Sequence, residues 1–249
     1  MQLIFMILFA LFGAGSTGAA MAAQACEGGV FDGLPYTLCS FDPAQTEIRI
    51  YHREPSGEPF GSFDSLVRQL WRERHYLIVA MNGGMYHQDL SPVGLFVEHG
   101  LERQPISTKS GWGNFHLLPN GVFWLKDGRA GVTETFRYLK ERRSADYATQ
   151  SGPMLVIDGA IHPRFLPDSD SLKIRNGIGV DADGTVHMVI SEMPVRFYDF
   201  ARLFRDRLGC RNALYLDGTI SSLYAADSGR RDHLFPLGPI IAVIGTVPQ

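Results

Sequence analysis

The sequence predicts an α+β fold: one domain of mostly antiparallel β-sheet that is built from hairpins and carries a few helices. The main observation is a set of Asx-Gly pairs between apolar or alternating segments, the strongest short-range signal of a β-hairpin. These pairs are Asn120-Gly121, Asp127-Gly128, Asp158-Gly159 and Asp183-Gly184. The second observation is that two segments show helical spacing of apolar residues. Because consecutive hairpins give antiparallel meanders rather than βαβ crossovers, we expect antiparallel sheets.

The turns predict which strands pair. The expected pairs are 115–118 with 122–125, 122–125 with 130–133, 154–157 with 160–161, and 177–180 with 186–191. Other apolar runs predict strands at 46–52, 76–81, 92–97, 213–216 and 240–245. Residues 163–171 are rich in Pro, Asp and Ser, which is typical of a surface loop and suits a lid.

Two amphipathic helices are expected. The first covers residues 62–74, with an apolar stripe formed by Phe63, Leu66, Val67, Leu70 and Trp71. The second covers residues 198–208 and stops at Gly209, with a stripe formed by Phe197, Phe200, Ala201, Phe204 and Leu208. Both stripes are interpreted as core faces.

The N-terminus has the pattern of a secretory signal peptide. Residues 3–12 are almost uninterrupted apolar sequence, too short to span a membrane, and an alanine-rich run follows at 19–23. We therefore expect residues 1–23 to be removed, with no transmembrane anchor left on residues 24–249, and the protein to be secreted or periplasmic. The segment ending at Cys26 also resembles a lipoprotein cleavage box, which would instead tether the protein through Cys26.

Composition limits the partners. With 45% hydrophobic and 20% charged residues the chain is an ordinary globular protein. Its formal net charge of −3 supplies no basic field for nucleic acid, so no nucleic-acid partner is expected. Of three cysteines, Cys26 and Cys39 enclose a short loop and form the expected disulfide, and Cys210 is expected to be a buried thiol.

Asp217 is the first candidate for chemistry. It follows the apolar strand 213–216 and precedes Gly218 and small hydroxyl residues. A carboxylate at the end of a buried strand sits on a rigid support, and partial burial raises its pKa toward a range useful for acid–base work. The alternative is a plain turn, because Asp-Gly is a turn-former.

Asn82, Gly83 and Gly84 form a second candidate, because they also follow a buried strand. Glycine permits close approach of a ligand to the backbone, and an Asn amide both donates to and accepts from sugar hydroxyls. A tight turn is the alternative. Arg175, just before the strand 177–180, could clamp a phosphate, since guanidinium binds two phosphate oxygens at once.

These segments together resemble the phosphodiester glycosidase family, over about residues 40 to 247. The family has an Asp-Gly-Gly-Gly-Ser-like segment, whose ends match Asp217, Gly218 and Ser221, whereas Thr219 and Ile220 stand where glycines are commoner. The resemblance also covers Arg175 before a Gly-x-Gly strand, and Ser151-Gly152 before an apolar strand.

The resemblance implies an exported hydrolase that cleaves the glycosidic bond of a sugar-1-phosphodiester. Asp217 and Arg175 would be catalytic, and the substrate-binding set would be Asn82, Gly83, Gly84, Ser151, Gly152, Gly218, Thr219, Ser221 and His116. The alternative is a non-catalytic protein that binds a cell-envelope glycan. No Cys/His metal spacing, H-E-x-x-H or P-loop occurs in the sequence, so neither a metal nor another cofactor is expected.

Overall fold

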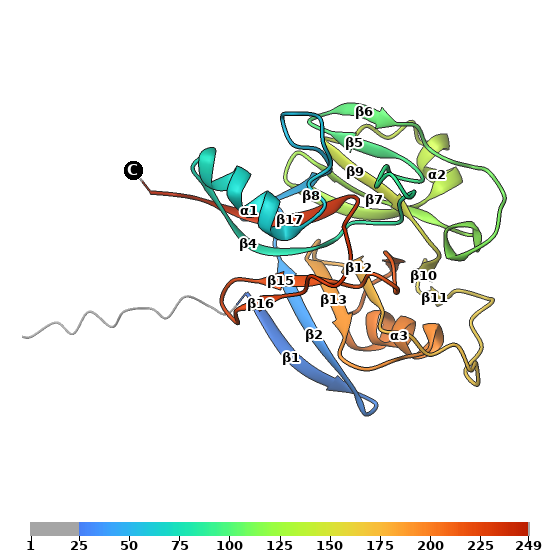
Figure 1. Cartoon of the computed structure of the whole chain (residues 1–249). Helices are drawn as coiled ribbons and strands as arrows, with labels where there is room; N and C mark the ends of the chain where they lie inside the picture. The colour runs from blue at the N-terminus through green and yellow to red at the C-terminus, as the bar shows by residue number, and fades with distance from the viewer. Residues whose placement is uncertain (1–24, 249) are drawn as a thin grey trace, which may run out of the picture.

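The computed structural model describes residues 25–248 as three antiparallel sheets arranged around one core (Figure 1). The largest sheet has the strand order β1-β2-β13-β12-β14-β10-β11. Its strands are β1 (Cys26–Phe31), β2 (Leu34–Phe41), β10 (Met154–Ile157), β11 (Ala160–Ile161), β12 (Asn176–Val180), β13 (Val186–Ser191) and β14 (Asn212–Tyr215). The predicted α+β class and antiparallel pairing are confirmed.

Two five-stranded sheets complete the fold. One has the order β16-β15-β4-β17-β3, with β3 (Glu47–Tyr51), β4 (His75–Asn82), β15 (Leu223–Ala225), β16 (Arg230–Arg231) and β17 (Ile240–Thr246). The other has the order β6-β5-β9-β7-β8, with β5 (Phe96–Glu98), β6 (Leu101–Gln104), β7 (Gly121–Lys126), β8 (Arg129–Glu134) and β9 (Tyr147–Ser151).

The apolar inner faces of all three sheets meet in a single core, which contains Ile50, Phe123, Met188, Leu214 and Val243. Each outer face is covered by its own helix (Figure 1). Helix α1 (Phe63–Arg72) covers the β4–β17 sheet, α2 (Thr135–Lys140) the β7–β9 sheet, and α3 (Phe197–Arg202) with the π-helical turn Leu203–Arg207 the largest sheet. Each sheet is therefore covered on both faces, by the common core on the inside and by a helix on the outside.

Both expected helices form, with changed ends. Helix α1 begins after Ser62, whose hydroxyl accepts a hydrogen bond from Ser65 N at 3.2 Å. Trp71 was expected in the core stripe but is 66% exposed, since it lies at the margin of the stripe formed by Phe63, Leu66 and Leu70. The second helix changes to π geometry after Arg202 and ends at Arg207, two residues before Gly209, where φ is +65°.

One predicted strand does not form, and the strand predicted at 92–97 is confined to Phe96–Glu98. Residues 115–118 were expected to pair with 122–125, but Asn114–His116 is a 3₁₀ turn. Pro119 follows directly and has no backbone N–H to give to a ladder, which disfavours a strand there. The other three hairpins form as predicted.

The N-terminal hairpin is closed by the expected disulfide between Cys26 and Cys39, and Cys210 is a buried free thiol. Because one sulfur cannot hold both a disulfide and a lipid thioether, this bond and a lipid tether at Cys26 exclude each other. The predicted signal peptide, residues 1–23, lies outside the described residues. Among residues 25–248, no helix is long and apolar enough to span a bilayer.

Candidate functional site

Asp217 lies one residue beyond the buried Leu216, at the end of β14. Its carboxylate Oδ1 accepts a hydrogen bond from Thr219 N at 3.1 Å. Burial raises the pKa of Asp217 to about 6, and the N–H groups of Thr219 and Ile220 oppose that rise. The carboxyl therefore titrates near neutral pH, as a general base or nucleophile requires.

Two buried asparagines fix the Asp217 loop. Asn176, the first residue of β12, donates from Nδ2 to Asn82 Oδ1 at 2.6 Å and accepts from Asp217 N at 3.1 Å. Asn82, the last residue of β4, also accepts at Oδ1 from Ser222 N at 3.0 Å. Both side chains are 0% exposed. Asn82 thus holds the loop that carries the carboxylate, and within residues 25–248 its Nδ2 has no hydrogen-bond partner.

Arg175 is also enclosed, at 1% exposure. Its guanidinium carbon lies 3.5 Å from the ring centroid of Phe197. Nε donates to Val195 O at 2.8 Å, and Nη2 donates to Ser171 O at 2.9 Å. The residue that the sequence indicated as a phosphate clamp is thus anchored to α3 and to the 163–171 loop, and burial lowers its pKa.

Tyr215 links Arg175 to the Asp217 loop. Its ring centroid is 5.7 Å from the Arg175 guanidinium carbon, and a Cβ placed on Gly218 would come within 2.3 Å of its hydroxyl. Gly218 is therefore required by packing against Tyr215. Burial and the nearby charge of Asp217 raise the pKa of Tyr215 to about 12. The pKa of Tyr86 is raised by the same two causes.

Four other predicted site residues, three with hydroxyl groups and one histidine, lie in different surroundings. Ser151 Oγ donates to Leu216 O at 2.8 Å, and Ser221 Oγ donates to Asp217 O at 2.8 Å, so both hydroxyls brace the strand end. Thr219 is exposed at the rim. His116 lies in the 3₁₀ turn and donates from Nδ1 to Lys109 O at 2.9 Å.

The predicted glycines outside the loop approach the protein's own atoms. A Cβ on Gly83 would lie 3.1 Å from Pro239 C, and one on Gly84 would lie 3.1 Å from Thr149 Oγ1. At Gly152 the nearest atom, Asn120 Cβ, would be only 2.6 Å away. These contacts explain the glycines by packing around the strand ends.

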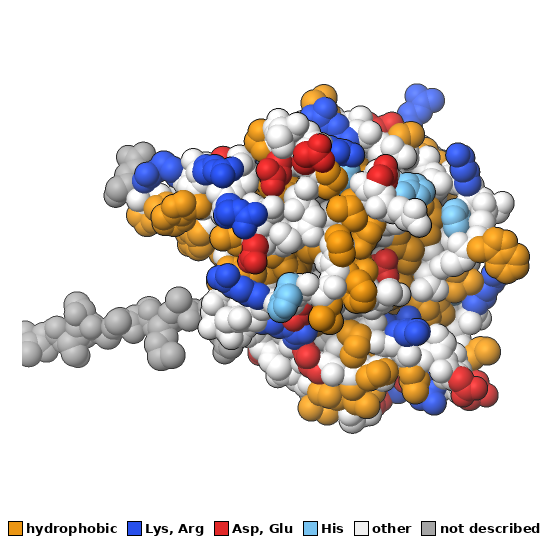
Figure 2. All heavy atoms as spheres, viewed as in Figure 1, with side chains coloured by type: hydrophobic (Ala, Val, Ile, Leu, Met, Phe, Trp, Pro, Cys, Tyr) orange, Lys and Arg blue, Asp and Glu red, His pale blue; other side chains and the backbone are white. Residues whose placement is uncertain are grey.

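A cavity of about 600 Å³ adjoins the Asp217 loop. Its lining includes Gly218, Thr219 and Ser221 of that loop, and the segment from Arg230 to Phe235. Figure 2 shows apolar side chains in a band through the middle of the viewed face, with charged side chains mainly around it.

The sequence interpretation missed Asn176, Tyr215 and the cavity residues Lys173 and Arg231. Asn176 stood directly before the predicted strand 177–180, and Tyr215 stood inside the predicted strand 213–216. A side chain with a polar group next to or within an apolar run was the available signal. Within residues 25–248, no group of three or more His, Cys, Asp or Glu side chains is placed to hold a metal ion.

A carboxyl with a raised pKa, an enclosed guanidinium and an adjoining cavity define a candidate hydrolase site on an antiparallel three-sheet fold. Residues 75–238 match the family model described as phosphodiester glycosidase. The chain belongs to this family, and the predicted resemblance is confirmed. The matched range includes Asn82, Arg175, Asp217 and every residue that lines the cavity.

The chain is also similar to a curated relative and to solved structures. The uncharacterized protein YigE of Escherichia coli (strain K12) is 33% identical over 202 residues, which are 81% of this chain and 79% of that protein. The catalytic domain of zebrafish N-acetylglucosamine-1-phosphodiester alpha-N-acetylglucosaminidase, auto-inhibited by a pro-peptide, superposes with a TM-score of 0.59 at 13% identity. This match covers 88% of our chain and 81% of that one.

A hypothetical protein from Synechocystis also superposes with a TM-score of 0.59, at 14% identity. This match covers 88% of our chain but only 61% of the length of the Synechocystis protein. At these identities the two structures show a shared fold.

Proposed function

We propose that the protein is a hydrolase that cleaves the glycosidic C1–O bond of a sugar-1-phosphodiester, releasing free sugar and a phosphomonoester. The observation that carries the proposal is Asp217, a carboxyl whose pKa is raised to about 6 at a strand end fixed by buried asparagines. The family assignment supports the reaction class. An N-acetylglucosamine-1-phosphodiester is the first substrate to test, because the zebrafish neighbour is named for that reaction.

The anomeric phosphate leaves readily once its charge is held, so the site needs cations and one carboxylate. Asp217 is ionised above about pH 6 and either attacks C1 or activates water. Arg175 stands beside Tyr215 and the Asp217 loop, where its charge favours a phosphate. To contact that phosphate, Arg175 exchanges its bond to Ser171 O for a phosphate oxygen, which links substrate binding to the 163–171 loop.

We also propose that the protein works outside the cytoplasm, secreted or periplasmic, after removal of residues 1–23. The signal-peptide pattern supports export. The Cys26–Cys39 disulfide supports it independently, because such bonds persist in oxidising compartments. Secretion of a tagged full-length chain, with the N-terminus of the product sequenced, tests this.

The test of function separates the two bonds that can break. The chain without residues 1–23 is incubated with N-acetylglucosamine-1-phosphodiesters, and free sugar is resolved from sugar phosphate. Free sugar from the wild type and none from Asp217→Asn supports the proposal. Sugar phosphate as the product moves the reaction to the P–O bond and contradicts it.

A glycan-binding protein without turnover is the second candidate. One observation favours it: the N–H groups of Thr219 and Ile220, where family members commonly have glycine, point to Asp217 rather than to open space. Saturable binding of an envelope glycan without any product would favour this candidate.

A further inference from the structure

The cavity beside the Asp217 loop has two kinds of wall. Cationic side chains, Lys173 and Arg231, stand at its rim, and Ile174, Ile190, Leu234 and Phe235 supply apolar surface. Leu234 is 81% exposed and Phe235 is 46% exposed. Exposed apolar side chains over a cavity with cations suit an amphiphile with one anionic group.

The segment that carries Leu234 and Phe235 is held at both ends. Asp232 N donates to Leu223 O at 3.1 Å, and Asp232 Oδ2 accepts from Leu223 N at 2.9 Å. On the other side Leu237 N donates to Gly61 O at 2.9 Å, and the Tyr86 hydroxyl donates to Pro236 O. The backbone that carries the two apolar side chains is therefore fixed before a ligand arrives, which reduces the entropy cost of binding.

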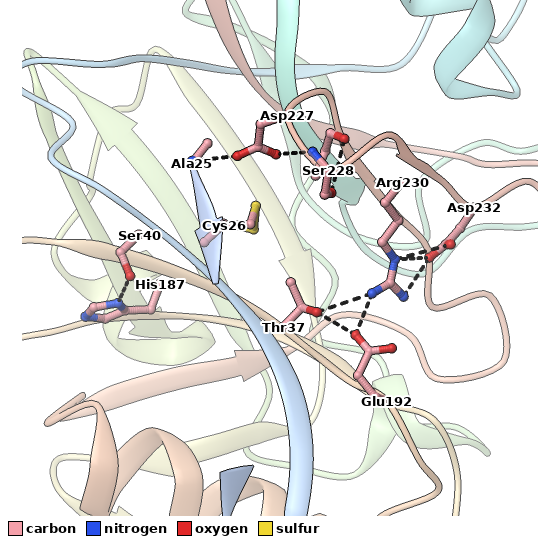
Figure 3. The surroundings of a disulfide bond; sticks show 12 residues. Ala25, Cys26, Thr37, Ser40, His187, Glu192, Asp227, Ser228, Arg230 and Asp232 are labelled. Atoms are coloured by element: carbon pink, nitrogen blue, oxygen red, sulfur yellow. Dashed lines mark hydrogen bonds and ion pairs between the residues drawn. A yellow bond between two sulfur atoms is a disulfide. The ribbon is translucent and has the colours of Figure 1, made fainter. Parts of the chain in front are cut away.

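The cationic side chains of the cavity differ in how strongly acidic residues already bind them. Arg230 is held by Glu192 and Asp232 and also bonds Thr37 (Figure 3). Arg230 is thus occupied by the two acidic residues of the cavity wall, and these three groups together carry a net charge of −1. Among residues 25–248, Arg231 has one ion-pair partner, Asp64 at 3.7 Å, with both side chains more than 60% exposed. Its guanidinium carbon also lies 5.5 Å from the ring centroid of Tyr224. Lys173 and Arg231 are thus the cations placed to attract a phosphate.

We propose that this cavity is an aglycone subsite for the apolar part of an amphiphilic sugar phosphodiester, an inference that rests on the proposed function. The sugar lies at Asp217, the phosphate crosses Gly218 to Ser221 toward Lys173 and Arg231, and a hydrocarbon group packs on Ile174, Ile190, Leu234 and Phe235. The substrate class is a glycosyl phosphate whose aglycone is a hydrocarbon rather than a second sugar.

The kinetic test compares methyl, butyl and hexyl esters of N-acetylglucosamine-1-phosphate. We expect kcat/KM to rise by about fourfold for each methylene that the cavity buries. In Leu234→Ser/Phe235→Ser this dependence on chain length is lost. The matched control is Leu101→Ser, which also removes an exposed leucine but on β6, away from the cavity, and which keeps the dependence. Equal kcat/KM for all three esters overturns the subsite and leaves the proposed function intact.

A binding test works even if no ester is hydrolysed. Isothermal titration with methyl phosphate and hexyl phosphate should give a Kd at least about tenfold lower for hexyl phosphate. Leu234→Ser/Phe235→Ser should abolish that ratio, and Lys173→Gln should weaken both ligands equally. Selective binding without turnover would refute the proposed function but keep the apolar subsite. Equal binding of the two phosphates overturns the subsite.

A third arm identifies the source of the amphiphile. The same headgroup on a long-chain ester is offered in phosphatidylcholine vesicles and compared with the monomeric hexyl ester. Faster cleavage on vesicles assigns a membrane lipid, and faster cleavage of the monomer assigns a free amphiphile; either supports an apolar aglycone.

Discussion

Asp217 and Asp181 follow neighbouring antiparallel strands of the largest sheet, β14 and β12, and so lie at opposite ends of it. Each carboxylate accepts hydrogen bonds from N–H groups of its own loop. Their pKa values move in opposite directions. The pKa of Asp217 is raised to about 6 by burial, whereas that of Asp181 is lowered because bonds to His187 and loop N–H groups outweigh its burial.

The pKa values of the two aspartates differ because different side chains lie beside their carboxylates. Asp181 Oδ2 is 3.0 Å from His187 Nε2, and His187 Nδ1 is 2.8 Å from Ser40 Oγ, which Figure 3 also shows. Asp217 has Tyr215 and Tyr86 as neighbours, and their pKa values are raised partly by its charge. An aspartate after a strand is therefore structural where an imidazole partners it, and suited to chemistry where burial leaves its charge costly.

The largest expected contrast is in activity. Asp217→Asn should lower kcat by about 10³-fold, because a positioned general base typically accelerates a reaction by about 10² to 10⁴-fold and the amide cannot replace it. Asp181→Asn should leave kcat within about threefold, because Asp181 stands at the opposite end of the sheet. Steady-state kinetics on an N-acetylglucosamine-1-phosphodiester, with circular dichroism to verify folding, measures both. Equal losses would remove the distinction between the two aspartates.

The two aspartates should also change stability with opposite pH dependence. The folded pKa of Asp217 is above its ordinary 3.8, so its favourable contribution is complete below about pH 4 and is lost as pH rises through about 6. Asp217→Asn should therefore increase the free energy of unfolding at pH 8 by up to about 3 kcal/mol, and not at pH 3.

Asp181 has a lowered folded pKa. Its contribution is present above the ordinary pKa and is lost as pH falls through the lower folded value. Asp181→Asn should cost about 1 kcal/mol at pH 8. Urea unfolding of both variants at pH 3 and pH 8 tests this pair, and a stabilising Asp181→Asn would contradict it.

The asparagines at the starts of the two strands sharpen the comparison. Asn176→Ala leaves Asp217 N without its buried acceptor and removes one of the two donors to Asn82 Oδ1, so we expect a loss of about 2 kcal/mol. The displaced carboxyl should lower kcat/KM at least about tenfold. Asn212 Oδ1 accepts from Asp158 N in a more exposed position. Asn212→Ala should cost about 1 kcal/mol without changing kcat/KM, and urea unfolding with kinetics measures both.

The smallest expected effect concerns the pH profile. If Asp217 acts ionised, kcat/KM should rise with pH to a midpoint near 6. Imidazoles as a class titrate in the same region, so His187→Gln and His116→Gln are needed to assign the midpoint. We expect neither substitution to move it. A shifted midpoint in His116→Gln would place that histidine in the reaction.

Local turn chemistry allowed much of the fold to be predicted. Asx-Gly pairs select the tight turns of hairpins, and three of the four predicted hairpins form. The spacing of apolar residues along the chain predicted both amphipathic helices and the strand before Asp217. The misplaced strand at 115–118 shows the limit, because the apolar alternation there competes with Pro119.

By itself the sequence determined the strand end that carries Asp217, the Cys26–Cys39 pairing and the family. Only the tertiary structure decided what surrounds the carboxyl. The Asn82–Asn176 bond joins residues 94 positions apart, Gly218 packs on Tyr215, and Leu234 and Phe235 line the same cavity as the Asp217 loop. A pKa depends on desolvation and on charges brought near through space. For that reason a turn pattern in the sequence can locate an aspartate, but only the folded chain decides whether that aspartate is structural or reactive.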